Sequence, residues 1–340
     1  MAQLQQHYPW TQTPLIVSAP MRTVSGAALT AAVSNAGGLG FFGAGYSLSD
    51  SAVLSDLSTL PTRLSPGASY GLGFLVFRSD LRDALSLTTL HRPAAVWFFA
   101  PADAAQLHEW LCAFRALDTR VWVQVSSVRE AEQVLCGQGG GVVSVLVAQG
   151  AADAGGHGKV CGGSVIALVP EVVDLLAEKG RTDVAVVAAG GVVDGRGVAA
   201  VLALGAGAAV LGTRFVACEE SEASRGFREL VVGSADGGVG TVRTRLYDNL
   251  RGTGFWPAEY GGRAIINESF RDAEKGVAED KNAELYAQAV TRNDFTRLTA
   301  FAGTGVGLVK EVLPAASIVE NLRTQAREVL RQQAVELGLL

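Results

Sequence analysis

Cysteine is scarce in this sequence. The 340 residues include four cysteines, Cys112, Cys136, Cys161 and Cys218, which are widely spaced and form no C-x-x-C pair. Such spacing is typical of neither a disulfide framework nor a zinc knuckle. We therefore expect reduced or buried thiols.

Charge is also sparse, and no long run of it has one sign. Lys and Arg number 28 against 33 Asp and Glu, which gives a net charge of -5. A partner with a phosphate backbone is recognised by clustered basic residues. Because no such cluster stands out, no nucleic-acid partner is expected.

Uninterrupted apolar runs of membrane-spanning length are missing too. The charge-free stretches 133–152 and 197–213 are broken by several glycines, whereas a spanning helix needs about 20 predominantly apolar residues. They are more typical of buried parallel strands with their turns. Residues 1–12 lack the basic start and apolar core of a signal peptide and the arginines of a transit peptide. The sequence thus predicts a cytoplasmic protein without a membrane segment.

Short apolar runs that alternate with segments of helical period are abundant. This alternation predicts repeated strand–helix units, and hence an α/β fold with a parallel sheet. Eight such units fit a (β/α)8 TIM barrel better than a doubly wound sheet, which typically has about six strands. The strands are expected at 14–20, 38–43, 70–77, 94–100, 120–125, 142–148, 183–190 and 208–213, and the helices near 25–36, 49–60, 79–90, 102–116, 127–138, 164–178 and 194–204.

The composition changes after about residue 235. Residues 1–235 are expected to form the barrel, and the polar residues 236–305, which show no further strand of comparable strength, a lid or substrate subdomain. Residues 306–340 are expected to form a C-terminal segment. Apolar residues from Pro314 onward keep helical spacing, so this segment should end in an amphipathic helix that packs on the barrel or on a second subunit.

Two glycine clusters follow the last two predicted strands. Gly190 and Gly191 remove side chains where a ligand must approach the backbone, and Gly212 precedes Thr213 at an expected helix N-terminus. Backbone N–H groups in such turns converge on anions. Ordinary turn glycines are the alternative. On consecutive strands of a barrel, however, the two clusters indicate a phosphate-bearing cofactor.

A third glycine-rich segment, 148–163, follows the sixth predicted strand. Gln149 offers an amide for the polar edge of a heterocycle, and His157 lies between Gly156 and Gly158. Histidine is the natural general acid or base near neutral pH, although a loop histidine often has no role. Cys161 follows His157 at a spacing of four without further ligands, so no metal site is expected.

Three ordered motifs carry a family resemblance: residues 18–45, 147–158 and 186–215, with a fourth similar segment at 301–315. Together they resemble the nitronate monooxygenase family, formerly called 2-nitropropane dioxygenases. The resemblance implies an FMN-dependent TIM barrel that oxidises an alkyl nitronate or nitroalkane with O2 to a carbonyl compound and nitrite. A homodimer is a possible assembly.

The resemblance also assigns roles to particular residues. His157 matches the catalytic histidine, and the phosphate would be held by the glycines of the last two strand ends. The residues expected to bind FMN are Ala19, Pro20, Met21, Gly73, Gln124, Gln149, Gly150, Gly156, Ala189, Gly190, Gly191, Leu211, Gly212 and Thr213.

The sequence departs from the family pattern in several places. Gly73 stands where many members carry Asn, and Asp153 replaces the usual Glu. The tyrosine-rich C-terminal signature of bacterial members is missing, and a different insert, which contains Arg251 and Trp256, stands in that region. Two other functions stay open on the residues alone. One is an NAD(P)H-dependent flavin reductase of the enoyl-acyl-carrier-protein reductase or quinone reductase type. The other is a flavin-free binding protein, in which the glycine clusters would be merely structural.

Overall fold

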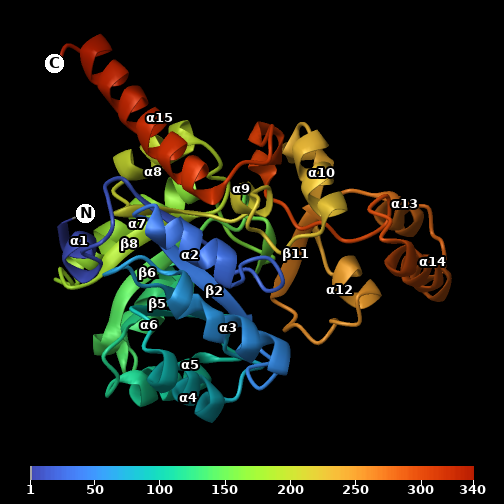
Figure 1. The fold of residues 1–340 in the computed structure, drawn as a ribbon, viewed down its shortest axis with the longest axis horizontal. Helices are drawn as coiled ribbons and strands as arrows, with labels where there is room; N and C mark the ends of the chain where they lie inside the picture. The colour runs from blue at the N-terminus through green and yellow to red at the C-terminus, as the bar shows by residue number, and fades with distance from the viewer. Residues whose placement is uncertain (1) are drawn as a thin grey trace.

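Eight parallel strands close into a barrel, so the predicted (β/α)8 TIM barrel is confirmed (Figure 1). The computed structural model describes residues 2–340. Each barrel strand coincides with a predicted one to within a few residues, because both of its faces are covered and its sequence is almost continuously apolar. The strands, in order around the barrel, are β1 (Leu15–Ser18), β2 (Leu39–Gly45), β3 (Gly71–Leu75), β4 (Ala95–Phe99), β5 (Arg120–Val125), β6 (Val143–Gln149), β8 (Ala185–Ala189) and β9 (Ala208–Leu211).

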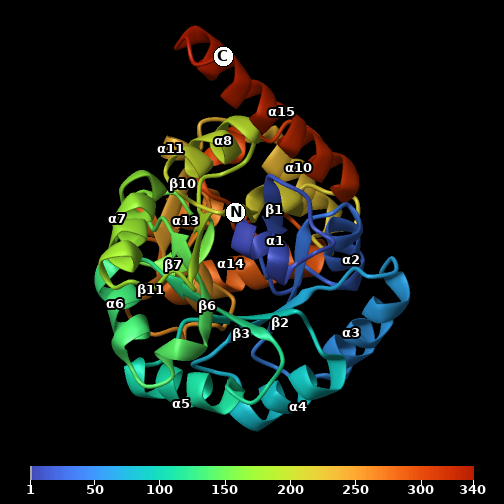
Figure 2. The same ribbon diagram turned by 90° about the vertical axis from the view of Figure 1, so that its left-hand side faces the viewer.

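Helices form the outer ring of the barrel (Figure 2). After each of the first strands the chain crosses over through one helix, and the predicted helices are all present. They are α2 (Ala27–Asn35), α3 (Ser51–Arg63), α4 (Leu81–His91), α5 (Ala104–Phe114), α6 (Val128–Cys136), α7 (Val165–Glu178) and α8 (Gly195–Ala203). A side chain from the residue before the helix caps α3 to α8, for instance Asp103 on the N–H of Gln106.

The amino end of the barrel is closed by aromatic side chains. Helix α1 (Ala2–His7) leads into Tyr8, whose hydroxyl accepts a 2.7 Å hydrogen bond from Trp122 Nε1. Trp122 stacks with Trp97, and Phe41 packs edge-on against Trp97. These side chains fill the interior from below. The open space of the barrel therefore lies at the carboxyl ends of the strands.

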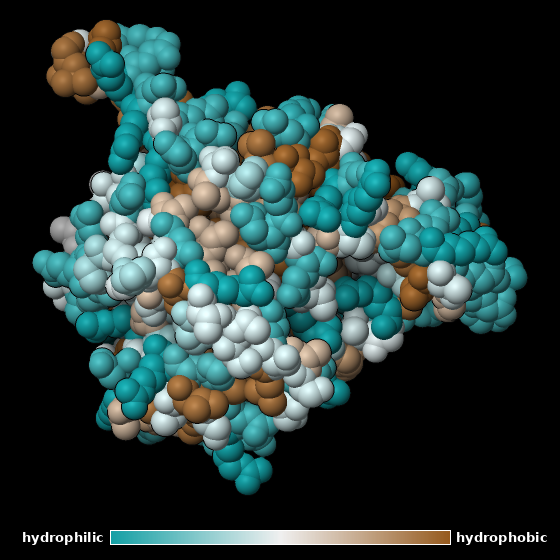
Figure 3. Space-filling view, in the orientation of Figure 1, coloured by the Kyte–Doolittle hydropathy of each residue, from teal (hydrophilic) through white to brown (hydrophobic). Residues whose placement is uncertain are grey.

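The last helix, α15 (Ala315–Glu336), occupies the eighth position of the ring, between α8 and α2 (Figure 2). It buries Ile318, Val319 and Leu322. Its final turns project beyond the barrel, and the exposed Leu337, Leu339 and Leu340 give it an apolar tip (Figure 3). Between β9 and α15 the chain makes an excursion over residues 217–314, called the insert below.

The insert contains strands that were not predicted from the sequence. Strands β10 (Thr241–Thr244) and β11 (Tyr260–Ile265) pair antiparallel, and β11 also pairs with β7 (Gly156–Lys159), which lies inside the glycine-rich segment after β6. The sequence predicted no further strand of comparable strength after residue 236, and it did not reveal β10 or the six-residue β11. These strands are short and rich in Gly and Arg, and the partner that stabilises β11 comes from about 100 residues away in the chain.

The remainder of the insert is helical. It includes α10 (Arg225–Gly233), α11 (Gly237–Gly240), α12 (Leu246–Leu250), α13 (Glu268–Glu274), α14 (Glu279–Arg292) and the 3-10 turn η2 (Thr304–Leu308), after the short α9 (Thr213–Val216); another 3-10 turn, η1 (Gly140–Val142), precedes β6. Across residues 2–340, no helix combines the length and apolar character that crossing a bilayer requires. The boundaries at residues 235 and 305, and a lid role for 236–305, stay predictions.

Arg323 fastens α15 to the start of the barrel. Its side chain is 5% exposed, and Nε donates to the carbonyl of Pro14. The terminal nitrogens donate to the carbonyls of Ala36, at 2.7 Å, and Gly37. A buried guanidinium that saturates three carbonyls is costly to remove, because the acceptors lose their partners.

Replacing Arg323 with Met should therefore destabilise the barrel. We expect Arg323→Met to lower the free energy of unfolding by about 2 to 4 kcal/mol, measured as a drop in the thermal midpoint. Arg331→Met, at an exposed position of the same helix, is the control and should leave the midpoint almost unchanged. Equal midpoints for the two variants would contradict a closing role for Arg323.

Candidate functional site

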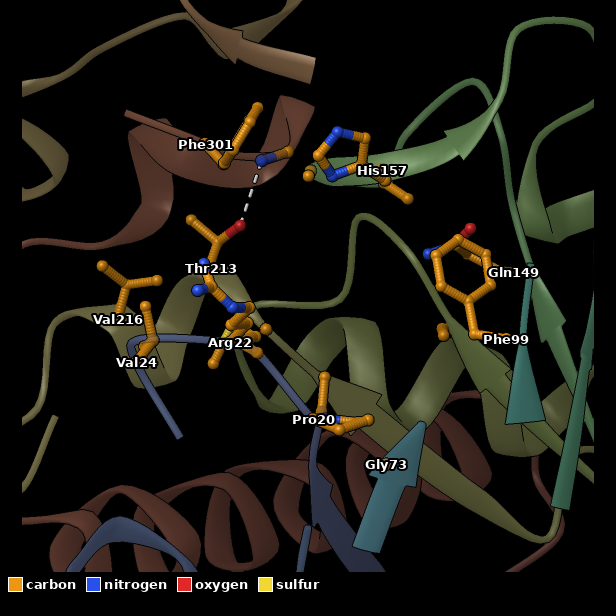
Figure 4. A pocket seen from close by; sticks show the side chains of 18 of the residues that line it. Pro20, Arg22, Val24, Gly73, Phe99, Gln149, His157, Thr213, Val216 and Phe301 are labelled. Atoms are coloured by element: carbon orange, nitrogen blue, oxygen red, sulfur yellow. Dashed lines mark hydrogen bonds between the residues drawn. The ribbon is translucent and has the colours of Figure 1, made fainter. Parts of the chain in front are cut away.

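A cavity of about 360 Å³ opens at the carboxyl end of the barrel, roofed by the insert (Figure 4). Its size lies in the usual range for small-molecule sites. Most of the residues expected in a site meet here. Those that line the cavity are Ala19, Pro20, Met21, Gly73, Gln124, Gln149, Gly156, His157, Ala189, Gly190, Gly191, Gly212 and Thr213.

Two expected residues, Gly150 and Leu211, do not line the cavity. The Leu211 side chain is fully buried in the core between strands and helices. Gly150 packs under the loop after β8, where its carbonyl oxygen would lie 2.9 Å from a Cβ on Gly190. Both residues lie behind those that line the cavity, and their contact with a ligand stays a prediction.

Backbone segments approach one another closely at the ends of β8 and β9. Gly190 and Gly191 have φ of 103° and 75°, a region that favours glycine. A Cβ on Gly303 would lie 2.6 Å from the Asp153 carbonyl oxygen, and one on Gly305 would lie 2.8 Å from the Gly191 oxygen. We call Gly190, Gly191, Gly212, Gly303 and Gly305 the glycine cradle. It leaves a concave backbone surface that is suited to an anion.

Thr213 connects β9 to the segment 301–305. Its Oγ1 accepts a 3.0 Å hydrogen bond from Gly303 N, the dashed line in Figure 4. The hydroxyl hydrogen stays available to a ligand. No site role was expected for Gly303 or Gly305, although the F-A-G-T-G run that holds them was part of the family resemblance. That run was the sequence feature from which the role of these two glycines could have been predicted.

Two glutamines form a polar floor beside the cradle. Gln124, the penultimate residue of β5, accepts a 3.1 Å hydrogen bond from Trp97 Nε1 on Oε1, and Gln149 is the last residue of β6. Within residues 2–340, Gln124 Nε2 and Gln149 Oε1 are buried without a partner. Such orphaned groups cost free energy unless a ligand pairs with them. The floor therefore fits a flat heterocycle whose edge carries both donors and acceptors.

Gly73 and Pro20 belong to the same wall of the cavity. The Pro20 ring covers the end of β3, since a Cβ on Gly73 would lie only 2.2 Å from Pro20 Cβ. A larger residue cannot fit at position 73 while Pro20 holds this place. The position of Pro20 therefore explains sterically why this chain has Gly rather than Asn at position 73.

His157 lies on β7, opposite Gly262 of β11. Its ring stacks on Trp256 with 3.8 Å between ring centroids and 8° between planes, and Phe301 lies 5.1 Å away. The side chain is 14% exposed. It lines the cavity as expected, but the insert covers it more than its two flanking glycines suggested.

Asp248 fixes the orientation of the imidazole. His157 Nε2 lies 2.8 Å from Asp248 Oδ1, and the carboxylate is 1% exposed. Thr253 Oγ1 also donates to that oxygen, at 3.1 Å. A carboxylate partner places the ring proton on Nε2, so Nδ1 is left as the acceptor for a substrate. The sequence offered no signal for Asp248, which is 91 residues away in the chain.

Burial lowers the pKa of His157 below its ordinary value, and the charges of Arg251 and Arg243 act in the same direction. The Asp248 carboxylate opposes this shift by hydrogen bonding and by its charge. The net result is an imidazole that is neutral at pH 7. A neutral imidazole with a free Nδ1 can remove a proton.

Arg243, on β10, holds the loop that leads into β7. One terminal nitrogen donates to the carbonyls of Gly156 and Gly261, and the other to those of Ala151 and Ala154, at 2.6 to 3.1 Å. Burial lowers the pKa of Arg243 to about 10, so it stays charged at neutral pH. The small antiparallel sheet thereby sets where His157 stands relative to the barrel.

A family model described as nitronate monooxygenase matches residues 9–57 and 87–325. The chain belongs to the nitronate monooxygenase family. It is 44% identical to a nitronate monooxygenase of Metarhizium robertsii, over 98% of this chain and 97% of that protein. It is 34% identical to one of Neurospora crassa, over 98% and 94%. The resemblance drawn from the motifs is confirmed, and it makes the protein an oxidoreductase.

Among solved structures, the chain is similar in fold to FabK of Thermotoga maritima, with a TM-score of 0.77, 24% identity and 98% of each chain covered. The nitronate monooxygenase family model leaves residues 58–86 unmatched. That gap contains β3 and Gly73, where the sequence also departs from the family pattern.

The contact between His157 and Asp248 can be tested without an activity assay. In Asp248→Asn the opposing carboxylate charge is lost, so the pKa of His157 should fall further and the imidazole should stay neutral to lower pH. An NMR titration of the imidazole signals measures this, with the His91 signal as an internal control. A His157 pKa that rises or does not move would contradict the assigned contact.

Proposed function

We propose that the protein is an FMN-dependent nitronate monooxygenase, which uses O2 to convert alkyl nitronates, or nitroalkanes after loss of the α-proton, to a carbonyl compound and nitrite. One observation carries the proposal. In a member of this family, the glycine cradle, the glutamine floor and an imidazole with a free nitrogen all face one cavity. Small-molecule substrates and O2 are the partners; a cytoplasmic location and a homodimer stay predictions from the sequence.

The residues present fit FMN. Its phosphate matches the glycine cradle with the Thr213 hydroxyl, and its ring edge matches the unpartnered Gln124 and Gln149 amides. Ala19, Pro20 and Met21 line the wall between them. When bound, the flavin would take electrons from the substrate and deliver them to O2.

His157 supplies the proton chemistry in this proposal. Its neutral Nδ1 accepts the α-proton of a nitroalkane, while Asp248 keeps the other proton on Nε2 and stabilises the imidazolium that forms. In the charged form, the same ring holds an anionic nitronate. Trp256 and Phe301 pack around the imidazole and limit access of water.

The cradle can be filled without disturbing the fold. Gly212 has an ordinary φ of −105°, and its nearest neighbour to an added Cβ is Met21 Sδ at 3.5 Å. We expect Gly212→Val to fold normally yet weaken FMN binding at least about tenfold, because its methyl groups occupy the anion's place. Quenching of FMN fluorescence by apoprotein measures the dissociation constant.

The matched control is Gly141→Val, in η1 at the amino end of the barrel, where an added Cβ meets no atom within 4 Å. It should bind FMN like the unmodified protein. If Gly212→Val also binds FMN with unchanged affinity, the phosphate does not lie in the glycine cradle.

Removal of the imidazole separates proton transfer from flavin binding. His157→Ala should retain FMN but lose about 10²- to 10⁴-fold in turnover of a nitroalkane, since general acid–base catalysis contributes about that much. Turnover of a preformed nitronate by His157→Ala should fall less than turnover of the nitroalkane, because the nitronate has no α-proton to lose. Nitrite formation and O2 uptake measure both. His91→Ala, on the outer helix α4, is the control, and full turnover in the His157 variant would remove the residue from the mechanism.

A further inference from the structure

Arg251 is an arginine at the cavity whose charge has no partner in the described part of the chain. Arg251 is exposed, and its side chain makes no ion pair and no hydrogen bond among residues 2–340. It lines the cavity, and its guanidinium carbon lies 5.1 Å from the centre of the Phe301 ring. An arginine held over an aromatic face keeps its N–H edge free for an anion.

The short helix α12 delivers Arg251 and Asp248 to the same place. Asp248 lies within the helix and Arg251 directly follows its last residue, three positions later. Tyr247 anchors the helix, because its buried hydroxyl hydrogen-bonds to the Ile265 carbonyl at 3.1 Å and to Asn267 Oδ1 at 3.0 Å. This one anchored turn therefore fixes the position of the Asp248 carboxylate, which orients His157, and the backbone position from which the Arg251 side chain extends.

Other arginines near the cavity are placed differently. The terminal nitrogens of Arg243 donate hydrogen bonds to four backbone carbonyls and are not free for a ligand. Arg78 lies over Phe255, 4.4 Å from the ring centre, and does not line the cavity. Arg22, on the loop after β1, also lines the cavity, and its guanidinium lies over Tyr46, 4.9 Å from the ring centre. The charges of Arg251 and Arg243 both act on His157, and of these two Arg251 is the one whose terminal nitrogens are not taken up by backbone carbonyls.

We propose that Arg251 binds the two oxygens of the substrate's nitronate group and thereby makes this site specific for small planar oxyanions. The inference rests on the proposed function, which supplies the nitronate. A guanidinium presents parallel N–H donors that match two oxygens on one trigonal atom, as in a carboxylate. Because the charge of Arg251 acts on His157, an anion bound to the guanidinium would lie near the imidazole.

Nitrate tests the site without turnover, because it is planar, anionic and inert. The FMN-loaded protein is titrated with nitrate in a buffer free of other small anions, by isothermal calorimetry. Arg251→Gln should weaken nitrate binding about 10- to 100-fold, the loss expected for charge-assisted hydrogen bonds. Arg251→Lys should fall between, since a lysine keeps the charge but loses the paired donors. Arg78→Gln removes a neighbouring rim charge and should bind nitrate normally.

Kinetics with two forms of one substrate give a second readout. Arg251→Gln should raise KM for ethyl nitronate by a similar factor, while KM for freshly dissolved neutral nitroethane changes much less.

Two sets of results separate this inference from the proposed function. Equal nitrate affinity in Arg251→Gln and the unmodified protein, or no nitrate binding at all, would overturn the role of Arg251. If nitrate binds through Arg251 but nitronates are not oxidised, the anion site stands and the proposed function fails. If Arg251→Gln is active and its KM for the nitronate is unchanged, the proposed function stands and the role of Arg251 fails.

Discussion

The hydrogen bond between His157 and Asp248 is the contact on which the site depends. It joins two segments 91 residues apart, one from the barrel and one from the insert, at 2.8 Å in a nearly buried position. Without the carboxylate as hydrogen-bond partner, nothing in the site would favour one imidazole tautomer over the other. His157 lies on β7, which pairing with β11 in the antiparallel sheet holds in register, and Asp248 lies on α12. The insert thus supplies the carboxylate that contacts His157, and in the proposed function it is part of the reaction centre.

Close approach of backbones is the second constraint. The ends of β8 and β9 meet the segment around Gly303 so tightly that any Cβ at several positions would touch a carbonyl oxygen. Only glycine leaves backbone N–H groups exposed on such a surface. The barrel closes this arrangement from below with large aromatic side chains. A rigid lower half therefore supports an upper half made of loops, as is usual for barrel enzymes.

The barrel could be predicted from sequence because its strands are buried on both faces, so each one appears as a continuous apolar run. AAVWFFA, for example, predicts a strand at 94–100 and contains β4 from Ala95 to Phe99. His157 and the glycines of the last strand ends could be found for a related reason, since their setting is local. Asp248 and the pairing of β7 with β11 could not be found, because both depend on contacts between distant segments and neither has a periodic pattern. Leu211 adjoins the cradle in sequence, but the alternation of side chains along β9 turns its side chain into the core, so an FMN contact of this residue would have to come from its backbone.

The proposed function requires that a flavin bound in this cavity is reduced by a nitronate. The most direct measurement is anaerobic rapid mixing of the FMN-loaded protein with propyl 2-nitronate and, separately, with NADPH, while the flavin absorbance is followed. We expect the nitronate to change the flavin absorbance rapidly and NADPH to leave it oxidised. Rapid bleaching by NADPH with no response to the nitronate would contradict this claim and favour a flavin reductase on the same barrel.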